Sequence, residues 1–198
     1  MIKLISLPDS KPYELFKDFY EQALALNQPN IEAISISSFD SKKKEVDSRF
    51  VNLKYINSEK WIFFTNYNSN KALQFLEHSQ ISAIVFWHTI NLQIRIKADL
   101  EKINEEQNQE HFESRSPEKN ALAISSNQSR PAQSYENIKE KYYRALDSED
   151  LTKCPDYWGG YSFKPYYFEF WEGRPNRLNI RNTYNFIDNN WEHRILEP

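Results

Sequence analysis

Three arginines follow an aromatic run near the end of the chain, in the stretch FEFWEGRPNRLNIRN (168–182). Arg174, Arg177 and Arg181 come shortly after Trp171. Guanidinium groups suit carboxylate and phosphate oxygens, and an indole ring offers a flat apolar surface. The stretch therefore predicts either a site for a planar, anionic ligand or, more simply, a solvated loop. For Arg174 we expect the solvated position.

Two further groups of basic side chains could hold an anion. Arg49 and Lys54 belong to SRFVNLK (48–54), where strand alternation would point them to opposite faces. They are either anion ligands or surface cations with extended side chains. Ser69 and Lys71 lie where a helix is predicted to begin, and helix N-termini attract phosphate, although serine is also a common cap. With only three glycines and no glycine-rich loop, any bound phosphate must be held by side chains.

Short β-type segments, rich in aromatic and β-branched residues, make up most of the predicted structure. They cover residues 32–39, 48–56, 60–67, 81–89, 92–103, 161–173 and 182–198. Helical patterns cover about 9–26, 69–78, 116–125 and 134–146, the last two within a polar region, 104–151. Because several connections between strands are short, the sequence predicts an antiparallel sheet forming a small barrel with helices outside. This is an α+β fold in a single domain, 1–198.

The composition argues against several classes of protein. The 25 basic and 28 acidic residues are mixed along the chain and give a net charge of −3, so we expect neither nucleic acid nor an anionic membrane as a partner. The single cysteine, Cys154, excludes an internal disulfide, and the four histidines lack ligand spacing, so no metal site is expected. No apolar run reaches the length of a signal peptide or a membrane span, which predicts a cytoplasmic protein.

Seven short motifs occur in an order that is more specific than any one of them. They are RFVNLK (49–54), FFTNYNSNKA (63–72), FWHTINLQIRI (86–96), FESR (112–115), NQSR (127–130), DYWGGY (156–161) and FEFWEGRPNRLNIR (168–181). Together they resemble the pyridoxamine/pyridoxine 5′-phosphate oxidase family. The resemblance implies an antiparallel, Greek-key split β-barrel with peripheral helices, forming a homodimer with FMN at the subunit interface. It also implies an activity, the oxidation of pyridoxamine or pyridoxine 5′-phosphate to pyridoxal 5′-phosphate with dioxygen as electron acceptor.

The same resemblance assigns roles to individual residues. The cofactor positions of the family fall on Arg49, Val51, Leu53, Lys54, Phe64, Thr65, Asn70, Lys71, Gln93, Gln128, Ser129, Trp171 and Arg181. The contacts to the FMN phosphate and ribityl chain would come from Arg49, Lys71, Ser129 and Arg181. The substrate positions fall on Lys54, His111, Arg115, Lys119, Arg177 and Asn179. Arg177 and Asn179 would be the catalytic residues.

Several positions differ from the family pattern. His111 and Lys119 replace a tyrosine and a serine of the substrate-phosphate clamp, and Asn70 replaces a second arginine at the cofactor phosphate. Asn179 replaces a histidine on the substrate side. The basic N-terminal segment that covers the substrate in the family is reduced to MIKLIS (1–6). FMN binding is therefore expected more firmly than the identity of the substrate.

Three functions remain open on these grounds. Lys54, Arg115 and Arg177 favour the pyridoxamine/pyridoxine 5′-phosphate oxidase. Asn179 and Ile180, with the reduced N-terminal segment, favour a related FMN-dependent oxidase acting on another substrate, as in phenazine biosynthesis. A non-catalytic flavin- or pyridoxal-phosphate-binding protein is the third function. If His111 does hold a phosphate, affinity is expected to fall as pH rises through the titration of its ring.

Overall fold

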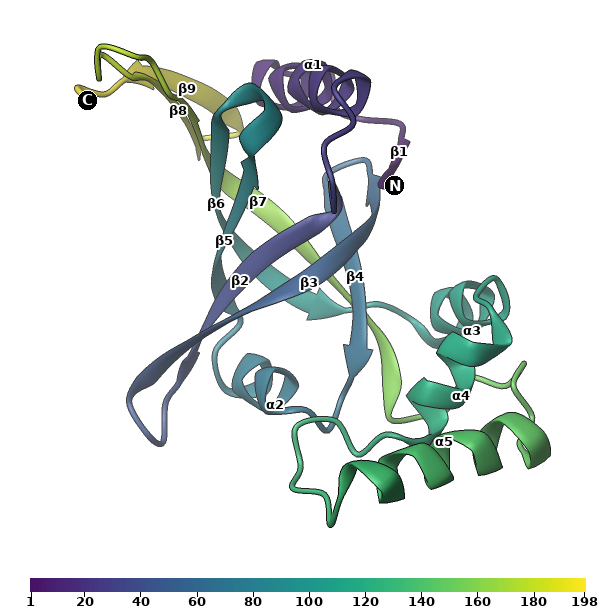
Figure 1. The fold of residues 1–198 in the computed structure, drawn as a ribbon. Helices are drawn as coiled ribbons and strands as arrows, with labels where there is room; N and C mark the ends of the chain where they lie inside the picture. The colour runs from purple at the N-terminus through teal and green to yellow at the C-terminus, as the bar shows by residue number, and fades with distance from the viewer.

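A closed ring of six antiparallel strands forms the centre of the molecule in the computed structural model, which describes residues 1–198 (Figure 1). The strands are β2 (Ala33–Asp40), β3 (Glu45–Asn57), β4 (Lys60–Asn66), β5 (Gln80–Trp87), β6 (Leu92–Lys102) and β7 (Trp158–Glu172). Their pairing order is β2, β3, β4, β7, β6, β5 and back to β2. The antiparallel barrel within an α+β fold is thereby confirmed.

Strand β7 changes its partner halfway along its length. Residues 158–163 pair with β4, whereas residues 167–172 pair with β8 (Ile180–Ile187), and β9 (Asn190–Ile195) extends that arm. A bulge opposite Lys97 and Ala98 falls beside Pro165, which has no N–H to donate to the sheet. The β8–β9 arm therefore leaves the barrel, at the upper left of Figure 1.

Helix α1 (Lys11–Ala25) packs its apolar stripe on the barrel and supplies part of the core. Phe16 from this helix contacts Trp61 edge to face, with ring centroids 4.5 Å apart. The remaining helices are η1 (His88–Ile90), α2 (Asn70–Glu77), α3 (Glu105–Glu113), α4 (Pro117–Ser125) and α5 (Tyr135–Ser148). Helices α3 to α5 gather together at the lower right of Figure 1, away from the β8–β9 arm. None of the helices has the length and apolar character needed to cross a membrane.

Three local features differ from the sequence-based expectation. The segment predicted as one strand over 182–198 is a hairpin, because Asp188 and Asn189 both adopt positive φ and turn the chain. A short strand, β1 (Lys3–Ile5), pairs in parallel with β3. The region 104–151 holds three helices where two were delimited, since Asn104 caps an additional one through its side chain.

Candidate functional site

A cleft of about 760 Å³ lies between the barrel and the helices α3 and α4. Strands β3 and β4 supply one wall, and the segment from α3 through residue 128 supplies the other. Nine of the predicted site residues line it: Val51, Lys54, Phe64, Thr65, Lys71, His111, Arg115, Lys119 and Gln128. The structure therefore brings most of the predicted cofactor and substrate positions on β3, β4 and α3–α4 into one cavity.

Lys71 is a buried cation that lines this cleft and lacks an acidic partner. Its side chain is 8% exposed, and its ammonium donates to Thr65 Oγ1 at 3.1 Å. Burial, together with the neighbouring positive charge of Arg49, lowers the pKa of Lys71 to about 8. A buried cation beside a second cation predicts an anionic ligand that would relieve both effects.

Two neighbours of Lys71 fit the same anion. Ser69 occupies the N-cap of α2, yet its hydroxyl caps nothing and is fully buried without a hydrogen-bond partner. The guanidinium of Arg49 is held by Ser38 Oγ at 2.6 Å and by Gln74 Oε1 at 3.1 Å. An unpartnered hydroxyl and a buried ammonium at the N-terminus of α2, with the Arg49 charge nearby, suit a phosphate group, so these residues fit the phosphate of FMN.

The rim of the cleft is closed by the loop after α4. Gln128 Oε1 accepts from the backbone N–H of Asn66 at 3.1 Å and from Thr65 Oγ1 at 3.3 Å. Ser129 follows it, exposed and with a φ of 68°. Asn70 is exposed at the first turn of α2, and Leu53 is buried in the hydrophobic core, so neither side chain lines the cleft.

Arg115 dominates the other end of the cleft. Its guanidinium lies 4.3 Å from the ring centroid of Trp158, and Nη2 donates to the carbonyl of Lys119 at 2.9 Å. Its Nη1 is buried and has no partner. Lys54 reaches the same end and pairs with Glu32 at 3.3 Å. The unpartnered Nη1 of Arg115 indicates a second place for an anion, separate from the one at Lys71.

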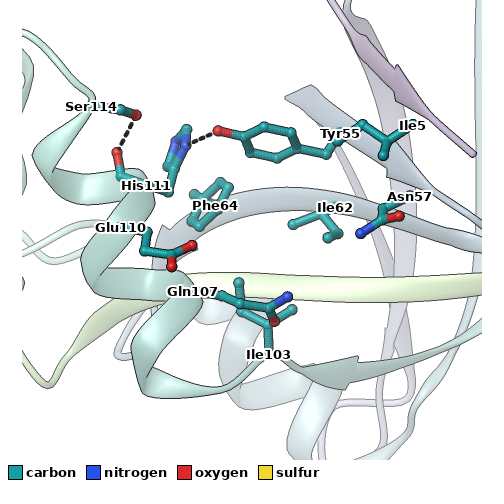
Figure 2. A pocket seen from close by; sticks show the side chains of 10 residues that line it. All are labelled: Ile5, Tyr55, Asn57, Ile62, Phe64, Ile103, Gln107, Glu110, His111 and Ser114. Carbon is teal, nitrogen blue, oxygen red and sulfur yellow. Dashed lines mark hydrogen bonds between the residues drawn. The ribbon is translucent and has the colours of Figure 1, made fainter.

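His111 stacks on Phe64, with ring centroids 3.6 Å apart, and its Nδ1 is 2.8 Å from the hydroxyl of Tyr55 (Figure 2). Burial lowers the pKa of His111 to about 4, and Arg115 and Lys54 add positive charge that acts in the same direction. The imidazolium therefore forms only around pH 4 and below. The fall in affinity that the sequence predicts through the titration of His111 would therefore lie around pH 4, because the ring is neutral at neutral pH.

A second set of predicted residues lies on strands β6, β7 and β8. Gln93, Trp171 and Arg181 are register neighbours across these three strands. Arg181 is bound through Nε and Nη2 to the carboxylate of Glu169, at 2.9 and 2.8 Å, and Arg95 binds the same carboxylate at 2.7 Å. None of this set, which we call the β6–β8 set, lines the cleft of its own chain.

The loop between β7 and β8 carries the predicted catalytic pair. Arg177 is exposed with a φ of 63°, and Asn179 Oδ1 accepts from the backbone N–H of Arg174 at 3.0 Å. Neither residue lines the cleft. Arg174 is exposed in the single chain and pairs with Glu172 at 3.2 Å.

Tyr55 and Trp158 are among the lining residues that were not predicted. Strand alternation places Lys54 and Tyr55 on opposite faces. A register shift in β3 between Leu53 and Tyr55 breaks the alternation, and both side chains line the cleft. No residue type marks that bulge in the sequence. Trp158 lies within the DYWGGY motif, so its proximity to the site could have been inferred from the motif alone.

Comparison with known proteins first defines the class. A solved structure of PhzG from Burkholderia lata 383 in complex with tetrahydrophenazine-1-carboxylic acid superimposes with a TM-score of 0.90, at 25% identity, covering 96% of this chain and 94% of the other. A pyridoxamine 5′-phosphate oxidase-related, FMN binding protein from Nostoc punctiforme shares the fold, with a TM-score of 0.79 at 13% identity, covering 96% and 100% of the two chains. The fold is that of the split-barrel flavoproteins.

Sequence comparison then identifies the family. The family model described as pyridoxamine 5′-phosphate oxidase matches residues 21–144, and the pyridoxine 5′-phosphate oxidase C-terminal dimerisation region matches residues 158–198. Pyridoxine/pyridoxamine 5′-phosphate oxidase 1 of Hydrogenovibrio crunogenus is 37% identical over 191 residues, 94% of this chain and 88% of that protein. The corresponding oxidase of Trichormus variabilis is 33% identical over 196 residues, 96% and 90% of the two chains. The chain belongs to the pyridoxamine 5′-phosphate oxidase family, a family of FMN-dependent oxidoreductases.

Proposed function

We propose that the protein is a homodimeric, FMN-dependent oxidase that converts pyridoxamine or pyridoxine 5′-phosphate to pyridoxal 5′-phosphate with dioxygen as electron acceptor. The observation that carries the proposal is the buried, unpartnered Nη1 of Arg115 in the cleft that also reaches Lys71. One cleft thus offers two separate places for an anion. A phosphorylated cofactor and a phosphorylated substrate bound side by side require that arrangement.

The residues that line the cleft, with Arg49 and Ser69 beside Lys71, would bind two ligands. Arg49, Lys71 and Ser69 would hold the FMN phosphate, and Thr65 and Gln128 would hydrogen-bond along the rest of the cofactor. When bound, FMN would supply the redox chemistry that links oxidation of the substrate to reduction of dioxygen. The protein therefore needs to bind and orient the ligands, and no side chain has to act as a nucleophile.

The substrate end would be held by side chains that can all donate to a phosphate. Arg115 offers its free Nη1, and Lys54 and Lys119 add positive charge around it. Lys54 is paired with Glu32. Burial acts to raise the pKa of Glu32, but the N-terminal ammonium and Lys54 together outweigh burial and lower it. Glu32 is therefore ionised at neutral pH, and the phosphate would compete with it for Lys54.

The β6–β8 set supports the proposed homodimer. Gln93, Trp171 and Arg181 are predicted to contact the cofactor, yet they lie outside the cleft of their own chain. The matched dimerisation region includes the last two of them. Two large apolar side chains are exposed: Phe86, the register partner of Gln93, is 54% exposed, and Phe50, which lines the cleft, is 75% exposed. We infer that a second subunit brings its β6–β8 set, with Arg177 and Asn179, to the cleft of the first.

A peroxide assay of the FMN-loaded protein tests the proposal. Pyridoxamine 5′-phosphate and pyridoxine 5′-phosphate are each supplied with dioxygen, and hydrogen peroxide and pyridoxal 5′-phosphate are measured together. Equal amounts of the two products are expected. A protein that binds FMN and pyridoxal 5′-phosphate but forms no peroxide would be the non-catalytic binding protein instead.

A related oxidase of the phenazine type is the second candidate. The similarity to PhzG and the presence of Asn179 in place of a basic or titratable group favour it. Tetrahydrophenazine-1-carboxylic acid, the compound in the PhzG structure, serves as the substrate in a parallel assay. Faster peroxide formation from this compound than from pyridoxamine 5′-phosphate would select the second candidate.

A further inference from the structure

Tyr55 lies at the substrate end of the cleft and has no role among the family positions. It follows Lys54 at the bulge in β3, so its ring turns toward helix α3. Its hydroxyl is 2.8 Å from His111 Nδ1, and the two rings meet nearly edge to face, at 83° with centroids 5.4 Å apart. Figure 2 shows the two side chains reaching toward one another from β3 and α3. The contact is therefore a hydrogen bond that joins β3 to α3 across the cleft.

We propose that Tyr55 is a positioning residue, which donates to Nδ1 of His111 and thereby holds the neutral ring with its Nε2–H free to donate to a substrate phosphate. The inference rests on the proposed function, because it concerns the phosphate end of that site. In the family pattern, the residue at the position of His111 is a tyrosine whose hydroxyl binds the substrate phosphate. In this chain, the Tyr55 hydroxyl and the His111 imidazole would together replace that hydroxyl.

The chemistry of the ring selects this arrangement. A neutral imidazole has one donor and one acceptor nitrogen, so the partner of one nitrogen sets the proton on the other. If Tyr55 donates to Nδ1, the proton lies on Nε2. The opposite arrangement would present a lone pair to the phosphate oxygens and repel them. The cations around the ring, Lys3, Lys54, Arg115 and Lys119, disfavour a second proton, so His111 has a single donor to place.

The packing keeps the ring from turning to another orientation. Phe64 stacks against one face of His111 at 15°. Ser114 Oγ donates to the carbonyl of His111 at 2.7 Å and fixes the end of α3. A second cavity of about 300 Å³ borders Tyr55 and His111, with Ile5, Ile62 and Ile103 among its walls (Figure 2). Neither ring has another side-chain hydrogen bond there, so each ring is oriented by the other.

The direct test is ¹⁵N NMR of histidine-labelled, FMN-loaded protein at neutral pH, with and without inorganic phosphate. The signals of His111 are identified by their loss in His111→Asn. The expected result is the tautomer protonated at Nε2, with Nδ1 accepting a hydrogen bond, in the wild-type protein with phosphate. Tyr55→Phe is expected to give a mixture of tautomers. The tautomer protonated at Nδ1 in the wild type would overturn the proposal.

Calorimetry of phosphate-ligand binding, with pyridoxal 5′-phosphate as the probe, gives a second reading. Loss of the neutral hydrogen bond that orients the His111 ring predicts roughly fivefold weaker binding in Tyr55→Phe. In the His111→Tyr background the same change is expected to cost about twofold or less, because the tyrosine donates by itself. Tyr143→Phe, on the exposed face of α5, is the matched control and is expected to bind like the wild type. An equal cost of Tyr55→Phe in both backgrounds would contradict the proposal.

Neither reading depends on turnover. A protein with the expected tautomer and binding cycle but no peroxide formation would retain the Tyr55 assignment and lose the oxidase. A protein that oxidises pyridoxamine 5′-phosphate but fails both readings would retain the oxidase and lose the assignment.

Discussion

The cleft and the β6–β8 set both contain basic residues, but their charges are balanced differently. In the cleft, Lys71 has no acidic partner and one nitrogen of Arg115 has no partner at all. In the β6–β8 set, Arg181 shares the carboxylate of Glu169, which is 1% exposed, with the neighbouring Arg95 of β6. Unpaired buried cations indicate a site that an external anion completes, whereas a buried carboxylate between two arginines holds strands together.

The largest expected effect removes both cations of the cofactor end. Arg49→Ala combined with Lys71→Ala is expected to weaken FMN binding by about a hundredfold or more, since each charge-assisted hydrogen bond contributes about 1.5–3 kcal/mol. Quenching of flavin fluorescence measures the affinity. Lys43→Ala, on the exposed β2–β3 turn, is the matched control and should bind FMN normally. A loss below threefold in the double variant would place the FMN phosphate elsewhere.

Arg115→Ala is the corresponding change at the substrate end. Loss of its guanidinium is expected to raise KM for pyridoxamine 5′-phosphate by roughly ten- to a hundredfold, for the same reason. The KM for unphosphorylated pyridoxamine should hardly change. Steady-state peroxide kinetics measure both values, with Arg144→Ala on α5 as the control. If both substrates lose affinity equally, Arg115 does not bind the phosphate.

Glu169→Ala tests the other half of the comparison, because it leaves two arginines without their carboxylate. The FMN-free protein is expected to lose about 2 kcal/mol in free energy of unfolding, a figure reduced from that of a fully buried pair because the arginines are partly exposed. Urea denaturation measures the change. Glu192→Ala breaks an exposed pair with Arg194 and should cost less than about 0.5 kcal/mol. Similar losses in the two variants would remove the distinction drawn between the regions.

A smaller effect concerns the pH dependence of FMN binding. The pKa of Lys71 is lowered to about 8, and a bound phosphate would raise it again. FMN affinity is therefore expected to fall as pH rises above about 8, because the free protein then loses the proton that the complex keeps. By the same linkage, the FMN-free protein should become more stable as pH rises from about 8 to the ordinary lysine range. In that range the unfolded chain binds more protons than the folded chain. Lys71→Arg should abolish the fall in affinity. If FMN affinity still falls above about pH 8 in this variant, the titrating group is not Lys71.

Sequence patterns predicted the barrel strands and helix α1 because both depend on local periodicity. Aromatic and β-branched alternation marks the strands, and the helical spacing of Tyr13, Phe16 and Tyr20 matches the buried stripe of α1. The hairpin in 182–198 was missed although Asp188 and Asn189 are typical turn residues. The strand β1 has only three residues, too few for a periodic signal.

The site was predictable to the extent that it depends on residue type. Motif order predicted the nine lining positions, yet it could not show that Arg181 binds Glu169, because that pair depends on strand register. It also could not show that Tyr55 faces the cleft, because a bulge reverses the alternation there. The charge state of His111 depends on burial and on cations from four other positions, which no local pattern contains.

The most direct test of the two-anion cleft is the ratio of kcat/KM for pyridoxamine 5′-phosphate to that for pyridoxamine, measured by peroxide formation in the wild-type, FMN-loaded protein. With Arg115, Lys54 and Lys119 around the substrate phosphate, the ratio is expected to be at least about a hundred, since two or more charge-assisted hydrogen bonds separate the two substrates. A ratio near one would contradict the account, because the second anion site of the cleft would then contribute nothing to the reaction.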